Sequence, residues 1–358
     1  MKDEECARYR ASDLRTFTAA AFRHFGVSDE DAAIGAEVLI DADLAGIESH
    51  GIAHLATHTG YVPGLKNGIV VASAQPAIVR DSPVAATWDA HGGLGIVTAR
   101  KAMEACIAKA AETGIGMITV RNGRHFGAAG YYAQMATRYD MVGMAMCNVP
   151  AIGAAAGGLD RVYGTNPIAF GAPVEGGPPF LLDIATTAVA AGKLEIAMRQ
   201  GKRIPAGWAM DAEGNDTDDA EALRKGGALL PLGSRLGTSS YKGYGLGLMV
   251  DILSGILPGA GSGLFIERGS GVHNFWFAAW RIDAFTEPPA FKAEMRRMVE
   301  QIRGTRPAAG VERVLIPGDP EHAARAERER DGVPLDTETV AELEALGREI
   351  GVGFPAAS

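Results

Sequence analysis

Apolar residues recur at helical spacing along the first 70 residues, and polar residues of helix-capping types lie between the apolar runs. This pattern predicts a helix over residues 13–25 that Ser12 caps, and a second helix that Ser28 caps and that ends near Gly46. A third helical stretch is predicted over residues 49–65. The amino-terminal region is therefore expected to be helical.

Beyond residue 70, short apolar runs of strand character alternate with helical stretches. The predicted strands cover residues 85–90, 116–122, 141–149, 179–183 and 273–282. The predicted helices fall within residues 91–114, 124–140, 184–197, 241–257, 291–304 and 337–350. Residues 198–235 are rich in Gly, Pro and Asp and predict an extended loop. Alternating strands and helices are typical of a layered α/β domain.

The composition is typical of a soluble enzyme. The chain has 358 residues, enough for about two domains, and 47% of them are hydrophobic. A net charge of −9 argues against a broad nucleic-acid-binding face. Three scattered cysteines form neither a disulfide framework nor a metal-binding knuckle. Residues 1–10 carry no signal-peptide core and no stretch reaches membrane-spanning length, so we expect a cytoplasmic protein without a membrane partner.

The most common dinucleotide-binding motif is missing from this sequence. A Rossmann site requires GxGxxG directly after a strand, so that the cofactor pyrophosphate lies on a helix N-terminus. The segments HGGLG (91–95) and GYGLG (243–247) come near this pattern but do not match it. General motifs alone therefore indicate an α/β enzyme without naming its chemistry.

Three histidines, His50, His54 and His58, are spaced four residues apart and would share one face of a continuous helix. One interpretation is a polar face whose histidines are merely solvated. A second is a zinc site, although three histidines on one straight helix rarely converge on a single metal. A third makes His50, at a predicted helix start, a neutral acid–base group, because a helix N-terminus lowers the pKa of an imidazole.

Three further polar residues lie where α/β proteins bind ligands. His125 follows a predicted strand, and it either caps the loop or works beside an anion at the next helix N-terminus. Asp183 ends an apolar run at the expected carboxyl edge of the sheet, where it can bind a ligand, cap a helix, or do both. Lys242 lies beside a glycine and is either solvated or a partner for phosphate or carboxylate.

Seven short motifs, taken in order, resemble one family. They are SHG (49–51), HFG (125–127), GTNP (164–167), DIAT (183–186), IPAGWAMDAEG (204–214), KGYGL (242–246) and IPGDPE (316–321). The set resembles the type-2 malate/L-lactate dehydrogenase family, which also includes ureidoglycolate, sulfolactate, diketogulonate and cyclic-imine carboxylate oxidoreductases. The resemblance covers about residues 10–353. This family lacks the Rossmann fold, which accounts for the missing GxGxxG.

The resemblance implies an α/β fold in which a three-layer domain with a mixed sheet joins a helical domain built from both chain termini. Residues 1–72 and 318–358 would form the helical domain, and residues 73–317 the NAD(P)-binding domain. A non-Rossmann cofactor site would lie between them, completed at a homodimer interface. The implied reaction moves a hydride between nicotinamide and C2 of a small 2-hydroxy or 2-oxo acid, or alternatively reduces a cyclic imino acid. We favour NADH as the cofactor, with NADPH possible and no metal required.

The resemblance also implies roles for individual residues. His50 would donate the proton to the substrate oxygen, and His125 is the second catalytic candidate. Ser49, His54 and Tyr61 would contact substrate. The residues expected at the cofactor are Asn148, Thr165, Asn166, Leu182, Asp183, Ile184, Ala185, Thr186, Thr187, Tyr241, Lys242, Pro317, Gly318 and Asp319.

His54 departs from the family pattern, because many members carry arginine four residues after the SHG histidine. A neutral imidazole cannot form the bidentate clamp that a guanidinium forms with a carboxylate. We therefore expect weak activity on plain pyruvate and oxaloacetate, and better activity on a bulkier or cyclic substrate. Activity on simple 2-oxo acids should improve toward about pH 6, where an unperturbed histidine gains charge.

Two functions of other classes stay open. A metal-dependent hydrolase would use the three spaced histidines, and tight stoichiometric zinc binding would support it. A catalytically idle binding protein would have kept the fold alone. The joint presence of His50, His125, Asp183 and Lys242 argues against an idle protein.

Overall fold

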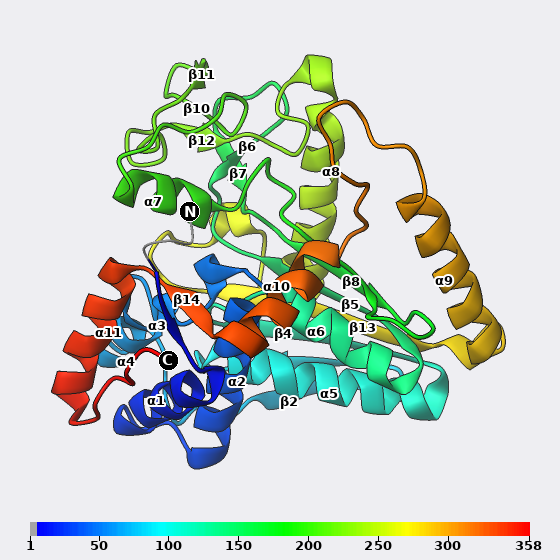
Figure 1. Cartoon of the computed structure of the whole chain (residues 1–358), viewed down its shortest axis with the longest axis horizontal. Coiled ribbons are helices and arrows are strands. Elements are labelled where there is room, and N and C mark those ends of the chain that lie inside the picture. The colour runs from blue at the N-terminus through cyan, green and yellow to red at the C-terminus, as the bar shows by residue number, and fades with distance from the viewer. Residues whose placement is uncertain (1–5) are drawn as a thin grey trace.

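A seven-stranded mixed sheet forms the centre of the computed structural model, which describes residues 6–358 (Figure 1). In order across the sheet the strands are β2 (Ala77–Asp81), β3 (Ala85–Asp89), β4 (Ile115–Gly123), β13 (His273–Arg281), β5 (Met141–Asn148), β8 (Ile168–Ala172) and β9 (Phe180–Ile184). Only β3 and β4 run parallel, and the other neighbouring pairs are antiparallel. The predicted mixed sheet is confirmed, and it differs from the parallel sheet of a Rossmann domain.

Helices cover both faces of this sheet. One face carries α5 (Gly95–Thr113) and α6 (Ala129–Met135), and the other carries α8 (Ser240–Asp251), the π-helical turn η5 (Ile252–Ile256) and α9 (Pro288–Arg303). The central strand β13 shows the alternation directly. Phe275 and Phe277 enter the main core with α5 and α6, whereas Trp276 and Ala278 pack beneath α8. Burial on both faces explains why this strand is a continuous apolar run.

The two ends of the chain meet beside the sheet, at the left of the view in Figure 1. They supply α1 (Ala11–His24), α2 (Asp29–Leu44), α10 (Asp319–Asp331), α11 (Thr337–Ile350) and the paired strands β1 (Ala7–Tyr9) and β14 (Val333–Leu335). One apolar core extends from these helices into the sheet. The division of the chain into domains at residues 72 and 318 stays a prediction, and residues 1–5 of the expected helical domain lie outside the described residues.

Of the two predicted helix caps, Ser28 is confirmed and Ser12 is wrong. Ser28 caps α2, since its hydroxyl accepts a hydrogen bond from the backbone N–H of Asp31 at 3.2 Å. Ser12 does not cap α1, because the helix already begins at Ala11. The Ser12 hydroxyl bonds to the side chain of Asp13 instead.

The predicted helix over residues 49–65 is wrong. The chain instead forms a 3-10 turn, η2 (Glu48–His50), and two short helices, α3 (Ala53–Ala56) and α4 (Tyr61–Lys66). Close packing at two glycines accompanies the interruptions. A Cβ on Gly51 would lie 1.8 Å from Asp43 Oδ1, and a Cβ on Gly60 would lie 2.2 Å from the carbonyl oxygen of His54.

Two predictions in the second half of the chain also need correction. The expected helix over 184–197 begins only at Ala191, as α7 (Ala191–Arg199), because the Thr186 backbone N–H and hydroxyl donate to the carbonyl of Thr165 in a loop.

The expected loop over 198–235 contains strands of a second, five-stranded sheet. In order across it the strands are β11 (Asp216–Thr217), β10 (Ala209–Met210), β12 (Ala228–Leu229), β6 (Gly153–Ala154) and β7 (Arg161–Tyr163). The remaining short 3-10 turns are η3 (Ala136–Tyr139), η4 (Leu236–Thr238), η6 (Gly263–Phe265) and η7 (Ile282–Ala284).

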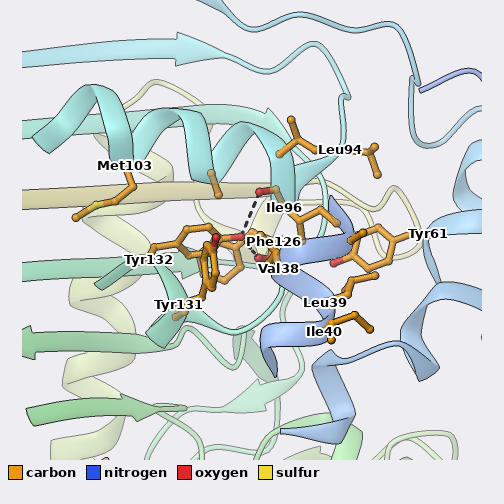
Figure 2. Packing of buried hydrophobic residues seen from close by; sticks show 14 of the residues in the cluster. Val38, Leu39, Ile40, Tyr61, Leu94, Ile96, Met103, Phe126, Tyr131 and Tyr132 are labelled. Atoms are coloured by element: carbon orange, nitrogen blue, oxygen red, sulfur yellow. Dashed lines mark hydrogen bonds between the residues drawn. The ribbon is translucent and has the colours of Figure 1, made fainter. Parts of the chain in front are cut away.

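The main core supports the region where α2, α4 and the loop after β4 meet. Figure 2 shows part of it, with Tyr61 and Met103 at opposite ends of the view. The Tyr132 hydroxyl donates to the backbone carbonyl of Phe126, which fixes the loop between β4 and α6. In the part of the chain that the structure describes, no helix combines the length and apolarity needed to cross a membrane.

Candidate active site

A cavity of about 370 Å³ lies where α3 and α4 face the ends of β4 and β13. Aromatic and charged side chains from all four segments line it. They are His54, His58, Tyr61, Arg124, His125 and His273. The structure thus brings His54, Tyr61 and His125, which the sequence assigned to substrate and catalysis, into one cavity.

His125 lies at the centre of the aromatic cluster. Its ring centroid is 5.4 Å from that of His50, 4.4 Å from that of His54 and 5.6 Å from that of His273. The Tyr61 hydroxyl lies 2.8 Å from His125 Nδ1, and the backbone N–H of Gly127 donates to the same nitrogen at 3.4 Å. Since a backbone N–H can only donate, this contact favours the tautomer that carries its proton on Nε2.

His50 is held by its own neighbour in the SHG motif. The Ser49 hydroxyl lies 2.9 Å from His50 Nδ1, and the ring of His50 stacks on that of His125 with an angle of 26° between the planes. Both candidate acid–base histidines therefore have Nδ1 engaged by a hydroxyl. Each can exchange a proton with a ligand through Nε2.

The turn that carries the SHG motif is held by the buried side chain of Asp43 on α2. Asp43 Oδ2 accepts a hydrogen bond from the backbone N–H of Ile52 at 2.7 Å, and burial raises the Asp43 pKa to about 8. Arg328 donates to the carbonyl oxygen of Asp43 at 2.6 Å and also pairs with Glu48. Helices from the two ends of the chain, α2 and α10, thus hold the motif between them.

Four histidines, His50, His54, His125 and His273, are neutral at physiological pH. Burial lowers the pKa of His50 and of His273 to about 4, and holds that of His125 well below its usual range. Burial, reinforced by repulsion from His50, His273 and Arg199, lowers the pKa of His54 to about 3. The expectation that His54 gains charge near pH 6 is therefore wrong. The low pKa of His50 comes from burial, whereas the sequence attributed it to a helix N-terminus.

His50, His54 and His58 do not share one helical face, because the chain forms η2, α3 and α4 here instead of one helix. His58 lies beyond the end of α3 and is exposed, whereas the His50 ring stacks on His125 and the His54 ring is tilted against it. Within residues 6–358, no three side chains of the His, Cys, Asp or Glu types are arranged to hold a metal ion. The premise of the zinc interpretation, one continuous helical face, is thus wrong.

Asp183 lies near the end of β9, as predicted, and its carboxylate faces the start of α6. Asp183 Oδ2 accepts a hydrogen bond from the backbone N–H of Gly130 at 2.7 Å, so it caps α6, a helix from an earlier part of the chain. Burial raises its pKa to about 6. A small depression beside it is also lined by Asp41, Glu321 and Arg325.

The turn at Pro317, Gly318 and Asp319 packs against β9. The Pro317 carbonyl accepts a hydrogen bond from the backbone N–H of Leu181 at 3.2 Å, and a Cβ on Gly318 would lie 3.1 Å from that same nitrogen. Asp319 pairs with Arg303. The structure therefore joins the predicted cofactor turn to the predicted cofactor strand around Leu182.

Several other predicted cofactor residues use their polar side-chain atoms inside the protein. Asn148 bonds to Asp251 and to Asn274, and Asn166 Nδ2 donates to a carbonyl of α8 at 2.8 Å. The Thr187 hydroxyl donates to a nearby carbonyl at 2.7 Å. Asn148 thus connects β5 to α8 and β13, and Asn166 connects the segment before β8 to α8.

Tyr241 and Lys242 lie on the first turn of α8, apart from both depressions described above. Tyr241 is 56% exposed, and the Lys242 ammonium lies 5.9 Å from the centroid of its ring. Both side chains are accessible from solvent in this chain.

Sequence reasoning missed two residues of the cavity, Arg124 and His273. Arg124 precedes His125 directly, so its position in the motif was a usable signal. His273 is 148 residues further along the chain than His125 in the numbering. It reaches the cavity because β13 pairs with β4, with His273 opposite Gly123, and only the strand order reveals that pairing.

The chain is similar to dehydrogenases over nearly its whole length. A sequence profile described as malate/L-lactate dehydrogenase matches residues 9–344. The chain is 42% identical to a malate dehydrogenase of Pyrococcus abyssi over 357 residues, which cover 98% of this chain and 97% of that protein. The chain belongs to the malate/L-lactate dehydrogenase family. As a member of this family it is an oxidoreductase that acts on the CH–OH group of a hydroxy acid.

Other relatives agree with this assignment. The dehydrogenase is 37% identical to an L-sulfolactate dehydrogenase of Methanocaldococcus jannaschii, over 93% of this chain and 94% of that one. The crystal structure of malate dehydrogenase from Entamoeba histolytica superposes with a TM-score of 0.95 at 29% identity, covering 98% of this chain and 100% of the other. The mixed sheet described above is therefore shared with solved dehydrogenases.

Proposed function

We propose that the cavity of His54, His125 and His273 is the place where a 2-hydroxy or 2-oxo acid exchanges a hydride with a nicotinamide cofactor. The observation that carries this proposal is the stack of His50 on His125, in which each ring has Nδ1 engaged by a hydroxyl. Such an arrangement leaves Nε2 for proton exchange with the oxygen on C2 of the substrate. The nicotinamide, when bound, supplies or accepts the hydride.

The protein's part in this chemistry is to hold a proton and a substrate in place. His50 is our first choice as proton donor, and His125 is the alternative. Both imidazoles are neutral, so the proton that either ring donates to a developing alkoxide is its single N–H proton on Nε2, and the ring regains a proton through Nδ1, which a hydroxyl engages. Ser49 and Tyr61 fix the ring orientations, and His54 can offer the substrate one hydrogen bond.

The residues present fit a dinucleotide in two respects. Nδ1 of His273 is a buried nitrogen without a hydrogen-bond partner among residues 6–358, and it belongs to a side chain of the cavity wall. The second respect is the depression beside Asp183, where carboxylates can bind ribose hydroxyls. We propose that Leu182, Asp183 and the turn from Pro317 to Asp319 hold the cofactor there.

We also propose NADH as the preferred cofactor. Asp183 and Glu321 line the depression that would hold a ribose, and Arg325 beside them is paired with Asp41 at 2.9 Å. Unpaired negative charge repels the 2′-phosphate that distinguishes NADPH from NADH. The test is a titration of the protein with each reduced cofactor, followed by nicotinamide fluorescence, and then a reduction assay over 2-oxo acids and cyclic imino acids. Absence of binding and of turnover with either cofactor would contradict the proposal.

We further propose that the enzyme is a cytoplasmic homodimer in which α8 and the following turns contribute to the interface. Several large apolar side chains are exposed along this stretch. They are Tyr241, Ile252, Ile256, Leu257, Leu264 and Phe265, the last with 82% of its surface accessible. Exposed apolar residues gathered in one region are typical of an interface. Light scattering should give twice the chain mass for the unmodified protein and the single mass for Phe265→Asp, whereas a monomeric unmodified protein would contradict the dimer.

A further inference from the structure

Arg124 is a partly buried cation in the cavity wall that no acidic side chain of the described part of the chain neutralises. Its Nε donates to the carbonyl oxygen of Ile69 at 2.5 Å and its Nη1 to that of Gly123 at 2.9 Å. It forms no ion pair with an acidic side chain of residues 6–358. The backbone bonds hold the guanidinium in place without removing its charge.

Three other partly buried arginines are paired with acidic side chains, whereas Arg161 donates only to backbone carbonyls and lies away from the cavity of the histidines. Arg100 bonds to Glu37 and Glu104, Arg121 lies 2.9 Å from Asp89, and Arg325 lies 2.9 Å from Asp41. A cation that is removed from water without a partner costs free energy, so proteins normally pair it. An unpaired guanidinium that lines a ligand cavity is therefore available to an anionic ligand.

The position of Arg124 relative to the histidines suggests which part of a substrate it meets. Its Nε bonds to the carbonyl of Ile69, and a Cβ on Gly271 would lie 3.4 Å from its Cδ, whereas the His125 ring is engaged by the Tyr61 hydroxyl. The His125 and His273 ring centroids are 5.6 Å apart. The guanidinium thus lies at the part of the cavity wall that Ile69 and Gly271 form, and no hydrogen bond connects it to His125. If the reacting oxygen lies at His125, a group on Arg124 is several bonds away from it.

We propose that Arg124 binds a second carboxylate, at the end of the substrate remote from the reacting carbon, and so selects 2-oxo and 2-hydroxy acids that carry two acidic groups. This inference rests on the proposed function of the same cavity. Arginine suits the role because its planar fork can donate two parallel hydrogen bonds to a carboxylate. Weak activity is still expected for pyruvate, which has one carboxylate, but the expectation of weak activity for oxaloacetate is reversed.

Two four-carbon substrates test the proposal, because they differ only in the remote group. Oxaloacetate carries a carboxylate where 2-oxobutyrate carries a methyl group. We expect kcat/KM of the unmodified enzyme to favour oxaloacetate by about 10-fold to 100-fold, the usual range for a charge-assisted hydrogen-bonded pair. Arg124→Gln should reduce this ratio to about 3 or less, mainly through KM for oxaloacetate, and leave kcat/KM for 2-oxobutyrate within about 3-fold. Arg124→Lys should retain part of the preference.

The matched control is Arg80→Gln, which removes the same charge from an exposed position on the edge strand β2. It should leave the substrate ratio unchanged. Equal losses on both substrates in Arg124→Gln, or an unchanged ratio, would overturn the proposal.

Calorimetry with malonate, a dicarboxylate that accepts no hydride, separates this proposal from the proposed function. If no 2-oxo acid is reduced, malonate binding that Arg124→Gln abolishes still supports the anion site, and malonate binding that the variant retains overturns it.

Discussion

The Tyr61 hydroxyl lies 2.8 Å from Nδ1 of His125, and this contact connects the amino-terminal helices to the sheet across 64 residues of sequence. Tyr61 is 2% exposed and packs edge to face against Phe22, so its ring is fixed by the core. With Nδ1 engaged, Nε2 is the His125 nitrogen that remains for a ligand. The orientation of a central imidazole is thus set by a residue of another segment.

The first prediction removes that contact. Tyr61→Phe should lower kcat by about 10-fold, the usual cost of a lost hydrogen bond of this kind, because the His125 ring is no longer held. The melting temperature should change little, since the phenylalanine ring keeps the contact with Phe22. Steady-state kinetics beside Tyr139→Phe, a change at an exposed tyrosine, measure the effect. A kcat for Tyr61→Phe equal to that of the control would show that the contact has no catalytic role.

The second prediction separates the two acid–base candidates. His50→Ala should lower kcat by about 100-fold or more and leave cofactor affinity nearly intact, as expected for loss of a general acid. His125→Ala should have a smaller effect on kcat if its role is to orient His50. Kinetics and cofactor titration of both variants decide between them. The reverse pattern would assign the proton transfer to His125.

The third prediction concerns Gly51, the last residue of the SHG motif. A Cβ there would lie 1.8 Å from Asp43 Oδ1, so either the backbone at Gly51 or the Asp43 side chain would have to move. Gly51→Ala should therefore lower the melting temperature and abolish most activity. Gly177→Ala is the matched control, because no atom lies within 4 Å of the added Cβ. Equal stability of the two variants in thermal unfolding would refute the proposed tight packing under the motif.

The fourth prediction concerns pH. The folded-state pKa of His54 is about 3, below the unfolded value of about 6.5. Between these values only the unfolded state binds the proton, so the stability contributed by neutral His54 is lost as pH falls. The raised pKa values of Asp43 and Asp183, about 8 and about 6, make the protein more stable as pH falls. This effect is the same in the unmodified protein and in a His54 variant, so it cancels when the two are compared. His54→Gln should therefore gain melting temperature relative to the unmodified protein between pH 7.5 and pH 5. A difference that stays constant over this range would contradict the low pKa.

Much of the fold could be predicted from hydrophobic periodicity. The central strand over 273–282 and the helices α1, α2 and α11 are predictable because long, strongly patterned segments determine their own structure, whereas the highly charged α10 was not predicted as a helix. The break at Gly51 and Gly60 could not be recognised, because its physical cause lies in Asp43 and in local backbone contacts. The small sheet built from residues 153–229 has strands of two or three residues, too short for any period to appear.

The candidate site was predictable in part. His125 and His54 belong to motifs or regular spacings, so the sequence singled them out, and the structure brings them within 4.4 Å between ring centroids. His273 could not be found, because its place depends on the pairing of β13 with β4. The charge state of the cluster was also hidden, since the pKa of each histidine depends on burial among the others.

The central claim is that this cavity transfers a hydride between a nicotinamide cofactor and C2 of a 2-oxo acid. The most direct measurement is to incubate the enzyme with oxaloacetate and reduced cofactor that carries deuterium in both positions at nicotinamide C4, and to analyse the product by mass spectrometry. The account predicts malate with one deuterium on C2, formed about 100-fold or more slowly by His50→Ala. Malate with hydrogen alone on C2, or absence of a reduced product from all the 2-oxo and cyclic imino acids tested with either cofactor, would contradict it.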